Sequence, residues 1–327
     1  MWLFYIFDTV TMVVFALLAS IRSKSNLSFF TRFIYEVVSY LLRQAEHRSL
    51  AWLRFQDKML GFVYWRSSKS IGSSQYHLDV RSYTIRPCKK MVSNTLLIYL
   101  HGGGFVLHSK HVYQAFCQKL SNETGMELVF LDYNLAPDAT YPRIHHDCLA
   151  AIASVITQHP GAAVQLVGDS AGANILLYCY QCLDEKNRAS VTGLAMISPW
   201  LEISSTVGEN LHKNSDDYLT TSILAKWQQS YCDEIQSAEL DDIIRRFEFT
   251  QTPNIFIQYS STELIAYQAE AFVRRSRLAG RAITISHYPA LFHIFQILAM
   301  DSPEGRDAIA QLCNFLKSNV AVQNNQD

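Results

Sequence analysis

The sequence lacks an excess of charge of either sign, because 28 Lys and Arg residues stand against 29 Asp and Glu, for a formal net charge of −1. Nucleic-acid binding requires a basic surplus that neutralises phosphates, so we expect no nucleic-acid partner. Charged residues make up only 17% of the 327 residues and hydrophobic residues 49%, which allows one large core to form. The chain is thus predicted to fold as one large domain with room for a small lid.

Regular spacings of cysteine and histidine are also missing. The seven cysteines are scattered and odd in number, unlike a disulfide framework. Cys179 and Cys182 form a C-x-x-C without a second ligand pair nearby, which favours buried thiols over a metal or redox site. His145 and His146 are adjacent on a predicted helix and cannot face one metal ion as residues four apart do. We therefore expect no metal site.

One long hydrophobic run is present, at residues 2–21. About 20 residues at roughly 1.5 Å each span a bilayer core, and eleven Leu, Ile, Phe and Val outweigh the single Asp8. No Lys or Arg precedes Arg22, which is atypical of a cleaved signal peptide. We predict that residues 1–21 form a single-pass membrane anchor. The alternatives are a signal peptide and an apolar helix that packs on the domain or lies in the membrane interface.

The rest of the chain alternates between strand and helix patterns. Apolar runs typical of buried strands follow an alternating run at 75–85, and lie at 96–100, 128–132, 164–167, 194–197, 255–259 and 283–287. Segments of helical length lie at 111–123, 142–157, 170–186, 262–279 and 303–318. This order predicts the α/β class, with a mainly parallel central sheet and helices on both of its faces.

Two further segments stand outside that alternation. Residues 27–65 carry Leu and aromatic side chains at helical spacing, which predicts two amphipathic helices. Residues 204–250 separate two predicted strands and are too long and too helical for a connecting loop. We predict one domain over residues 22–327, with a helical lid formed by these two segments.

A strained turn is predicted after the strand at 164–167. Residues 167–172 read V-G-D-S-A-G, so a G-x-S-x-G pattern follows a buried strand and opens a helix, as in a nucleophile elbow. Side chains at Gly168 and Gly172 would collide with the neighbouring strand and helix. Ser170 is then presented at the carboxyl edge of the sheet, at a helix N-terminus that favours negative charge. The alternative is an ordinary N-cap serine, since the pattern also occurs by chance.

A glycine run follows the neighbouring strand at 96–100. Residues 101–105 read H-G-G-G-F, and successive glycines let backbone N–H groups point at one spot without interference from Cβ atoms. Such N–H groups stabilise the oxyanion of a tetrahedral intermediate. Because both motifs end neighbouring predicted strands, we expect acyl-transfer chemistry with Ser170 as the nucleophile.

With these motifs the chain resembles the hormone-sensitive-lipase-like esterases of the α/β-hydrolase superfamily. The matching words are HGGGF at 101–105, DYNLAPDATYP at 132–142, GDSAG at 168–172, ISPW at 197–200, STEL at 261–264 and FHIFQ at 292–296. The hydrophobic N-terminus and the lid region look most like the membrane-anchored branch of arylacetamide deacetylases and fungal steryl acetyl hydrolases. The resemblance implies oxyanion donors at Gly103, Gly104 and Ala171. It also implies structural roles within the motifs for His101, Gly102, Gly168, Asp169 and Gly172.

The acid and the base of such a site follow the serine in that order, each in a loop after a late strand. Glu263 is the first carboxylate after the strand at 255–259, although its surroundings lack the glycine and the following Asp usual in the family. A glutamate serving a helix dipole is the alternative. His293 lies between the last predicted strand and an apolar helix, and the resemblance favours it as the base. Its rival, His287, lies within a predicted strand.

We therefore expect a serine carboxylic-ester hydrolase that works through an acyl-enzyme, with no metal or organic cofactor. The resemblance implies short acyl esters of apolar alcohols, such as lipid or sterol acetates, with Trp227 and Tyr231 as aromatic lid residues. The alternatives are a hydrolase-fold binding protein or receptor without turnover, and a peptidase. If the source is eukaryotic, the resemblance implies the endoplasmic reticulum membrane. The sequence has N-glycosylation sequons at Asn26 and Asn122, which would permit glycosylation in the lumen. The oligomeric state and the side of the membrane stay open.

Overall fold

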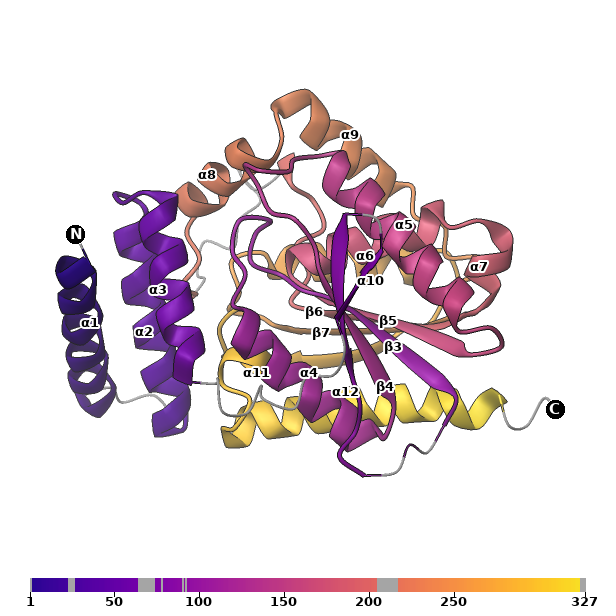
Figure 1. Cartoon of the computed structure of the whole chain (residues 1–327), viewed down its shortest axis with the longest axis horizontal. Coiled ribbons are helices and arrows are strands. Elements are labelled where there is room, and N and C mark those ends of the chain that lie inside the picture. Colours follow the sequence, from indigo (N-terminus) through magenta and orange to yellow (C-terminus); the bar gives the residue numbers. More distant parts are fainter. Residues whose placement is uncertain are drawn as a thin grey trace.

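A computed structural model describes residues 2–22, 27–63, 74–77, 79–89, 91, 93–204 and 217–323. Its centre is an eight-stranded sheet in the order β1-β2-β4-β3-β5-β6-β7-β8 (Figure 1). Antiparallel pairing joins β1 to β2 and β2 to β4, and all other neighbours are parallel. The strands are β1 (Ser74–His77), β2 (Val80–Ile85), β3 (Thr95–Leu100), β4 (Glu127–Asp132), β5 (Ala163–Asp169), β6 (Val191–Ile197), β7 (Asn254–Ser260) and β8 (Thr284–Tyr288). The predicted α/β class is confirmed.

One predicted strand is wrong in its extent. Residues 75–85 form two strands, because the chain turns between His77 and Val80, which pair with each other in the antiparallel hairpin. Alternation of period two continues through both arms of the hairpin, so the side-chain pattern did not reveal the turn.

Helices cover both faces of the sheet. The core on one face includes side chains from α4 and α12, and the core on the other face includes side chains from α5, α6 and α10. The bounds of the covering and connecting helices are α4 (Lys110–Thr124), α5 (Arg143–Gln158), α6 (Ala171–Cys182), α7 (Glu185–Ala189), α10 (Ala266–Leu278), α11 (Phe295–Leu298) and α12 (Pro303–Gln323). Strands β3 and β5 are buried along their whole length, as apolar runs between two helical layers require.

Three helices at the N-terminus lie beside the domain, at the left of Figure 1: α1 (Trp2–Arg22), α2 (Phe29–Ala45) and α3 (Leu50–Val63). Met12 and Ala16 of α1 are buried, and the ring of Phe15 lies 5.7 Å from that of Tyr40 on α2. Within the residues searched, no helix has the length and apolarity needed to span a membrane. The predicted anchor at 1–21 falls partly outside the described residues, since Met1 and the side chains of residues 2–10 are not described.

The inserted segment between β6 and β7 contains two helices, α8 (Thr221–Tyr231) and α9 (Glu234–Arg245). They lie along the top of the molecule in Figure 1. The Asp233 side chain caps α9 in a reciprocal capping box with Gln236. The helical content predicted for residues 204–250 is present, but residues 205–216 lie outside the described residues. That the segment acts as a lid stays a prediction.

Candidate active site

Ser170 occupies a strained turn between β5 and α6, with φ +48° and ψ −120°. A Cβ atom added at Gly172 would lie 2.1 Å from the backbone oxygen of Leu100, so only glycine fits where the helix crosses β3. The Ser170 amide donates to the Ile197 carbonyl at 2.9 Å, which ties the turn to the end of β6. Local backbone strain is thus held by neighbouring strands, and it presents the serine side chain at the carboxyl edge of the sheet.

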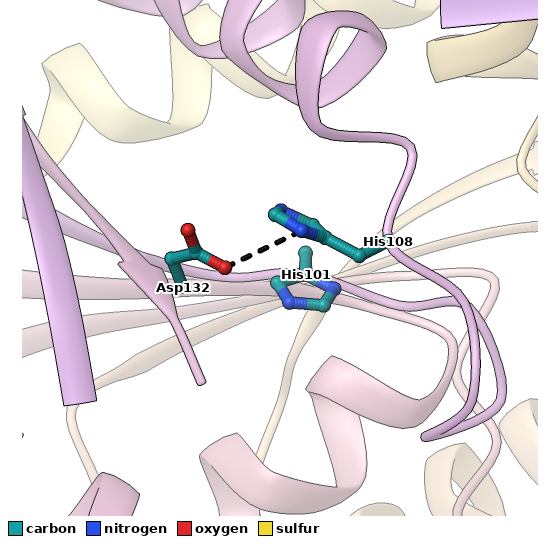
Figure 2. Close-up of side chains that lie close together, drawn as sticks. All are labelled: His101, His108 and Asp132. Carbon is teal, nitrogen blue, oxygen red and sulfur yellow. Dashed lines mark ion pairs between the residues drawn. The ribbon is translucent and has the colours of Figure 1, made fainter. Parts of the chain in front are cut away.

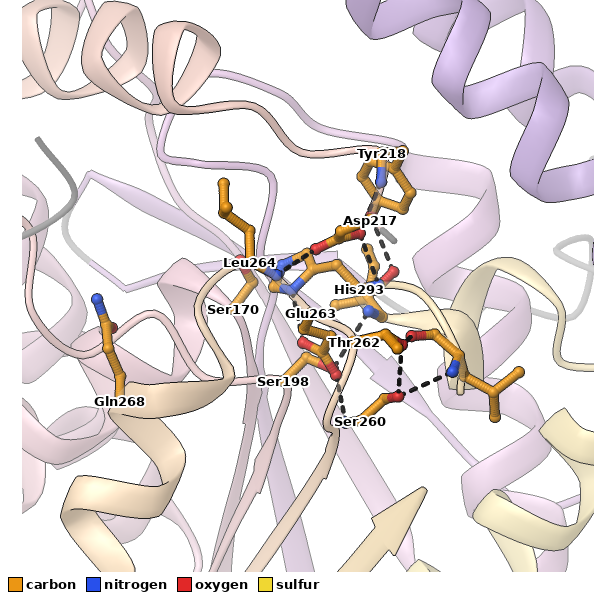
Figure 3. Close-up of polar contacts among 12 residues, drawn as sticks. Ser170, Ser198, Asp217, Tyr218, Ser260, Thr262, Glu263, Leu264, Gln268 and His293 are labelled. Atoms are coloured by element: carbon orange, nitrogen blue, oxygen red, sulfur yellow. Dashed lines mark hydrogen bonds and ion pairs between the residues drawn. The ribbon is translucent and has the colours of Figure 1, made fainter. Parts of the chain in front are cut away.

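The structure brings Ser170, His293 and Glu263 into one hydrogen-bonded row (Figure 3). The Ser170 hydroxyl lies 2.9 Å from His293 Nε2, and His293 Nδ1 lies 2.9 Å from Glu263 Oε2. Because a carboxylate only accepts, Nδ1 carries the proton and Nε2 is left to accept from the serine hydroxyl. The loops after β7 and β8 bring the two side chains together, although they are 30 residues apart in the chain.

Glu263 is held by three donors. Its Oε1 accepts from the Ser198 hydroxyl at 2.9 Å and from the Ser260 amide at 2.7 Å, while Oε2 accepts from His293. Ser198, in the ISPW segment, has φ +44°, and its hydroxyl also accepts from the Ile294 amide at 3.2 Å. This serine was missed as a site residue, because nothing in its local pattern indicates that β6 ends beside the acid. The available signals were its position directly after a buried strand and its place in the ISPW word that matches the family.

Opposing effects set the proton affinity of His293. Burial lowers the pKa of the imidazole, but the hydrogen bond and charge of Glu263, followed by the charges of Asp217 and Asp169, outweigh burial and leave the pKa raised. A raised pKa means that the imidazolium is stabilised relative to the neutral ring. His293 can therefore act as a general base toward Ser170 and hold the proton afterwards.

The glycine run lies against the serine turn. The Gly102 amide donates to Asp169 Oδ1 at 2.9 Å and so points into the protein. Gly103 and Gly104 have φ values of +96° and +61°, and both line the cavity beside the serine and the histidine. A Cβ atom at Gly104 would lie 2.2 Å from the Trp227 ring, so this position excludes any side chain. The backbone at 103 and 104 is therefore available to face a developing oxyanion, together with Ala171 at the start of α6.

Asp169 connects the two motifs. Its carboxylate accepts from the hydroxyls of Tyr99 and Tyr113 at 2.7 and 2.8 Å, in addition to the Gly102 amide. Burial raises the pKa of Asp169 to about 6, although these donors work in the opposite direction. A single buried side chain thus fixes the position of the glycine run relative to the serine turn. The two tyrosines were not identified from the sequence.

His101, His108 and Asp132 form a cluster beside the glycine run (Figure 2), with ligand atoms within 4.8 Å of one another. The two imidazole rings stack at 4.7 Å with planes only 27° apart, so their in-plane lone pairs cannot converge on one ion. His101 also stacks on Tyr133 at 4.1 Å, and its Nδ1 donates to the Gly102 carbonyl at 2.7 Å. Burial lowers the pKa of each histidine to about 3. The cluster fits a packing role that supports the glycine run.

An apolar cavity of about 350 Å³ opens beside Ser170 and His293. One wall comes from α2, through Phe30, Phe33, Ile34, Val37, Val38, Leu41 and Leu42. The hydroxyl groups of the lining residues Tyr113 and Tyr218 bond to protein partners, namely Asp169 and the His293 carbonyl. The cavity therefore offers an apolar surface to whatever group extends from the serine.

The remaining residues singled out from the sequence lie in three different surroundings. Trp227 lines the cavity, as expected of a lid residue. Tyr231 instead packs inside, since its ring stacks on Phe105 at 3.8 Å and its hydroxyl lies 2.8 Å from His145 Nδ1. His287, the rival base, lies on β8 beside Ser261 rather than beside Ser170. His145 is buried between Tyr231 and Asn174, whose side chains bond to its two ring nitrogens.

Comparisons with known proteins agree with this geometry. A family model described as an alpha/beta hydrolase fold matches residues 97–297. An acetyl-hydrolase of Streptomyces hygroscopicus is 26% identical over 236 residues, which cover 72% of this chain and 78% of that protein. An esterase of Acinetobacter venetianus is 27% identical over 242 residues, covering 70% and 77%. Hormone-sensitive lipase of Bos taurus is 28% identical over 170 residues, covering 48% of this chain and 21% of the lipase.

Solved structures show the same fold. An esterase of the archaeon Pyrobaculum calidifontis superposes with a TM-score of 0.74 at 19% identity, covering 87% of this chain and 97% of that one. An esterase of the bacterial hormone-sensitive lipase family gives a TM-score of 0.74 at 21% identity, covering 88% and 98%. Since the family model spans well over half of the chain and the serine turn, glycine run and hydrogen-bonded row lie at the expected edge of the sheet, the chain belongs to the alpha/beta hydrolase fold family, as a carboxylic ester hydrolase of the hormone-sensitive-lipase-like kind.

Proposed function

We propose that the enzyme hydrolyses short-chain acyl esters of apolar alcohols, such as lipid or sterol acetates, through an acyl-enzyme. The observation that carries the proposal is the Ser170–His293–Glu263 row, whose serine and histidine line an apolar cavity of about 350 Å³. Burial of the apolar alcohol part of the ester against this wall favours binding, because it removes apolar surface from water. The acetyl-hydrolase name of one relative supports the short acyl group.

The proposed mechanism has two acyl-transfer steps. His293 Nε2 takes the proton of Ser170 as the serine oxygen attacks the ester carbonyl, and Glu263 keeps the imidazolium oriented. The amides of Gly103, Gly104 and Ala171 face the oxyanion. The imidazolium then protonates the leaving alcohol, and water activated by His293 releases the acid from Ser170.

Activity on matched chromogenic substrates tests the reaction class. We expect hydrolysis of 4-nitrophenyl acetate and negligible hydrolysis of 4-nitroacetanilide. An amide is the less reactive substrate, because its nitrogen must be protonated as the C–N bond breaks, whereas 4-nitrophenolate leaves without a proton. Extending the acyl chain from acetate to palmitate should lower kcat/KM, and sterol acetates should be cleaved. Equal rates on amide and ester would favour the peptidase alternative.

A hydrolase-fold binding protein or receptor is the second candidate. Its distinguishing result is saturable binding of an apolar ester without product formation by the wild-type chain. The complete hydrogen-bonded row argues against it, because a binding protein has no need to keep Nε2 of a buried histidine directed at a strained serine.

We also propose that residues 1–21 attach the enzyme to a membrane. In a eukaryotic source we expect this to be the membrane of the endoplasmic reticulum. Outward-facing side chains of α1 support this, because Val14, Phe15, Leu18 and Ile21 are between 47% and 65% exposed. Deleting residues 1–21 should convert a membrane-pelleted protein into one that is extracted without detergent. If the shortened chain still resists alkaline carbonate, the attachment lies elsewhere, and Phe30 on α2 becomes the first suspect. An endoglycosidase shift at Asn26 or Asn122 would report the side of the membrane.

A further inference from the structure

A second carboxylate lies at the catalytic histidine, outside the row formed with Glu263. Asp217 immediately precedes Tyr218 in the segment that leads to α8. It is half-buried between the loop that carries Glu263 and the loop that carries His293 (Figure 3). Its Oδ1 accepts from the Tyr218 amide at 2.8 Å and from the His293 amide at 3.1 Å. Its Oδ2 accepts from the Leu264 amide at 2.9 Å, directly after Glu263. One carboxylate therefore joins the loop of the acid to the loop of the base.

The same segment holds both backbone polar groups of the catalytic histidine. While Asp217 accepts from the His293 N–H, the Tyr218 hydroxyl donates to the His293 carbonyl at 2.9 Å. The Tyr218 ring also lies edge-on to the imidazole, at 6.2 Å between centroids. The backbone of His293 is thus held by two consecutive residues of the inserted segment, neither of which makes a hydrogen bond of the row itself.

The negative charge of Asp217 also acts on His293, because it stabilises the imidazolium. The groups whose charges raise the pKa of His293 are Glu263 after β7, Asp217 before α8 and Asp169 at the end of β5, against the lowering effect of burial. Asp169 is already engaged by two tyrosines and the Gly102 amide. Burial raises the pKa of Asp217 to about 6, opposed chiefly by the positive charge of His293. Above that pH, Asp217 adds a negative charge beside the imidazole.

We propose that Asp217 is a positioning residue of the reaction, which fixes His293 through its backbone amide and supplies a second negative charge to the imidazolium. Proton transfer from Ser170 then depends on two carboxylates, one from the loop after β7 and one from the inserted segment. The inserted segment is accordingly part of the reaction's proton-transfer apparatus as well as a wall of the cavity. The proposal rests on the proposed function, because it concerns the rate that depends on Ser170.

The test is the pH profile of Asp217→Asn on 4-nitrophenyl acetate, with Asp242→Asn as the matched control. Asparagine keeps an oxygen for the Tyr218 and His293 amides, but it removes the charge and turns its NH₂ group toward the Leu264 amide, so that hydrogen bond is lost as well. We expect kcat to fall by about 10- to 100-fold with KM within about twofold, since the lost charge and the looser hold on His293 impair proton transfer while the apolar cavity that binds the substrate is unchanged. The base must be unprotonated, so a lower imidazole pKa moves the acid limb of kcat/KM to lower pH. Asp242 on α9 is half-exposed and paired with Arg246, the residue directly after the helix, so Asp242→Asn should match the wild type.

Tyr218→Phe separates position from charge. It removes the hydrogen bond to the His293 carbonyl and leaves every charge in place, so kcat should fall while the acid limb stays where it is. An unmoved acid limb in Asp217→Asn, whatever its kcat, would overturn the proposed role of the charge. If Asp217→Asn does not fold, as judged by circular dichroism, Tyr218→Phe decides the positioning role, and wild-type kcat in that variant overturns it. Retention of activity by Ser170→Ala would instead reject the proposed function, independently of these results.

Discussion

Ser170→Ala should abolish ester hydrolysis, with a fall in kcat of about 10⁴-fold or more on 4-nitrophenyl acetate. The hydroxyl oxygen is the proposed nucleophile, and without it His293 Nε2 has no proton to remove at this position. The fold should survive, because alanine keeps the Cβ atom and removes only the hydroxyl oxygen, whose hydrogen bond to His293 is lost. The Gly172 and Ile197 contacts that hold the turn are backbone contacts and remain.

Steady-state kinetics and thermal unfolding of the same preparation check this prediction. The melting temperature should stay close to that of the wild type while product formation drops to the uncatalysed rate. Retention of more than about one hundredth of the activity in a folded variant would falsify the assignment of Ser170, because loss of a triad member costs far more than that. If Ser170→Ala shows no cooperative unfolding transition, it is not properly folded, and Ser170→Cys takes its place. Cysteine should keep the fold and change the rate of acyl transfer.

Glu263→Gln should lower kcat by roughly 100- to 10,000-fold while KM changes little. The reason lies in the donors around the carboxylate. Ser260 presents a backbone N–H to Oε1 and cannot rotate it away, so the glutamine oxygen takes that side. The amide NH₂ then faces His293 Nδ1, which can no longer donate and must lose its proton. The proton moves to Nε2, where it blocks acceptance from the Ser170 hydroxyl.

The double variant supplies the main control. Once Ser170→Ala has been made, adding Glu263→Gln should cost almost nothing more, because residues that act as a unit are not additive. Two other carboxylates provide matched controls, since Glu270 and Asp242 form i,i+4 pairs with Arg274 and Arg246 on helix surfaces. Their amide variants should keep wild-type turnover. Normal turnover in Glu263→Gln together with a collapse in either control would show that the acid had been misassigned.

The serine turn and the glycine run could be predicted because both are local. Side chains at Gly172 or Gly104 would overlap atoms within 2.2 Å, so the residue types themselves report the contacts that each position allows. The parallel sheet could also be predicted, because burial on both faces leaves continuous apolar runs. The hairpin of β1 and β2 could not, since a tight turn between two alternating strands leaves the period unchanged.

Among the three residues of the row, the acid has the weakest local signal in the sequence, and its partners explain why. Glu263 is surrounded by Ser198, Ser260 and His293, and two of these three lie 30 or more residues away in the chain. A glutamate at the start of a helix has the same local pattern whether or not a histidine faces it. The structure brings the pair to 2.9 Å, a relation that no short motif encodes.

Sequence alone determined the fold class and the serine turn, because these depend on periodicity and glycine sterics, and the resemblance of the motifs indicated the family and the candidates Glu263 and His293. Tertiary structure decided which groups surround that row. It placed α2 along the cavity, directed the Gly102 amide into the protein, and set Asp217 and Tyr218 around the backbone of His293. These relations join elements separated by many residues. They arise from the pairing of β3 with β5 and from the packing of the N-terminal helices and the inserted segment around the site. Packing of that kind depends on shape across the whole molecule, and local patterns carry no record of it.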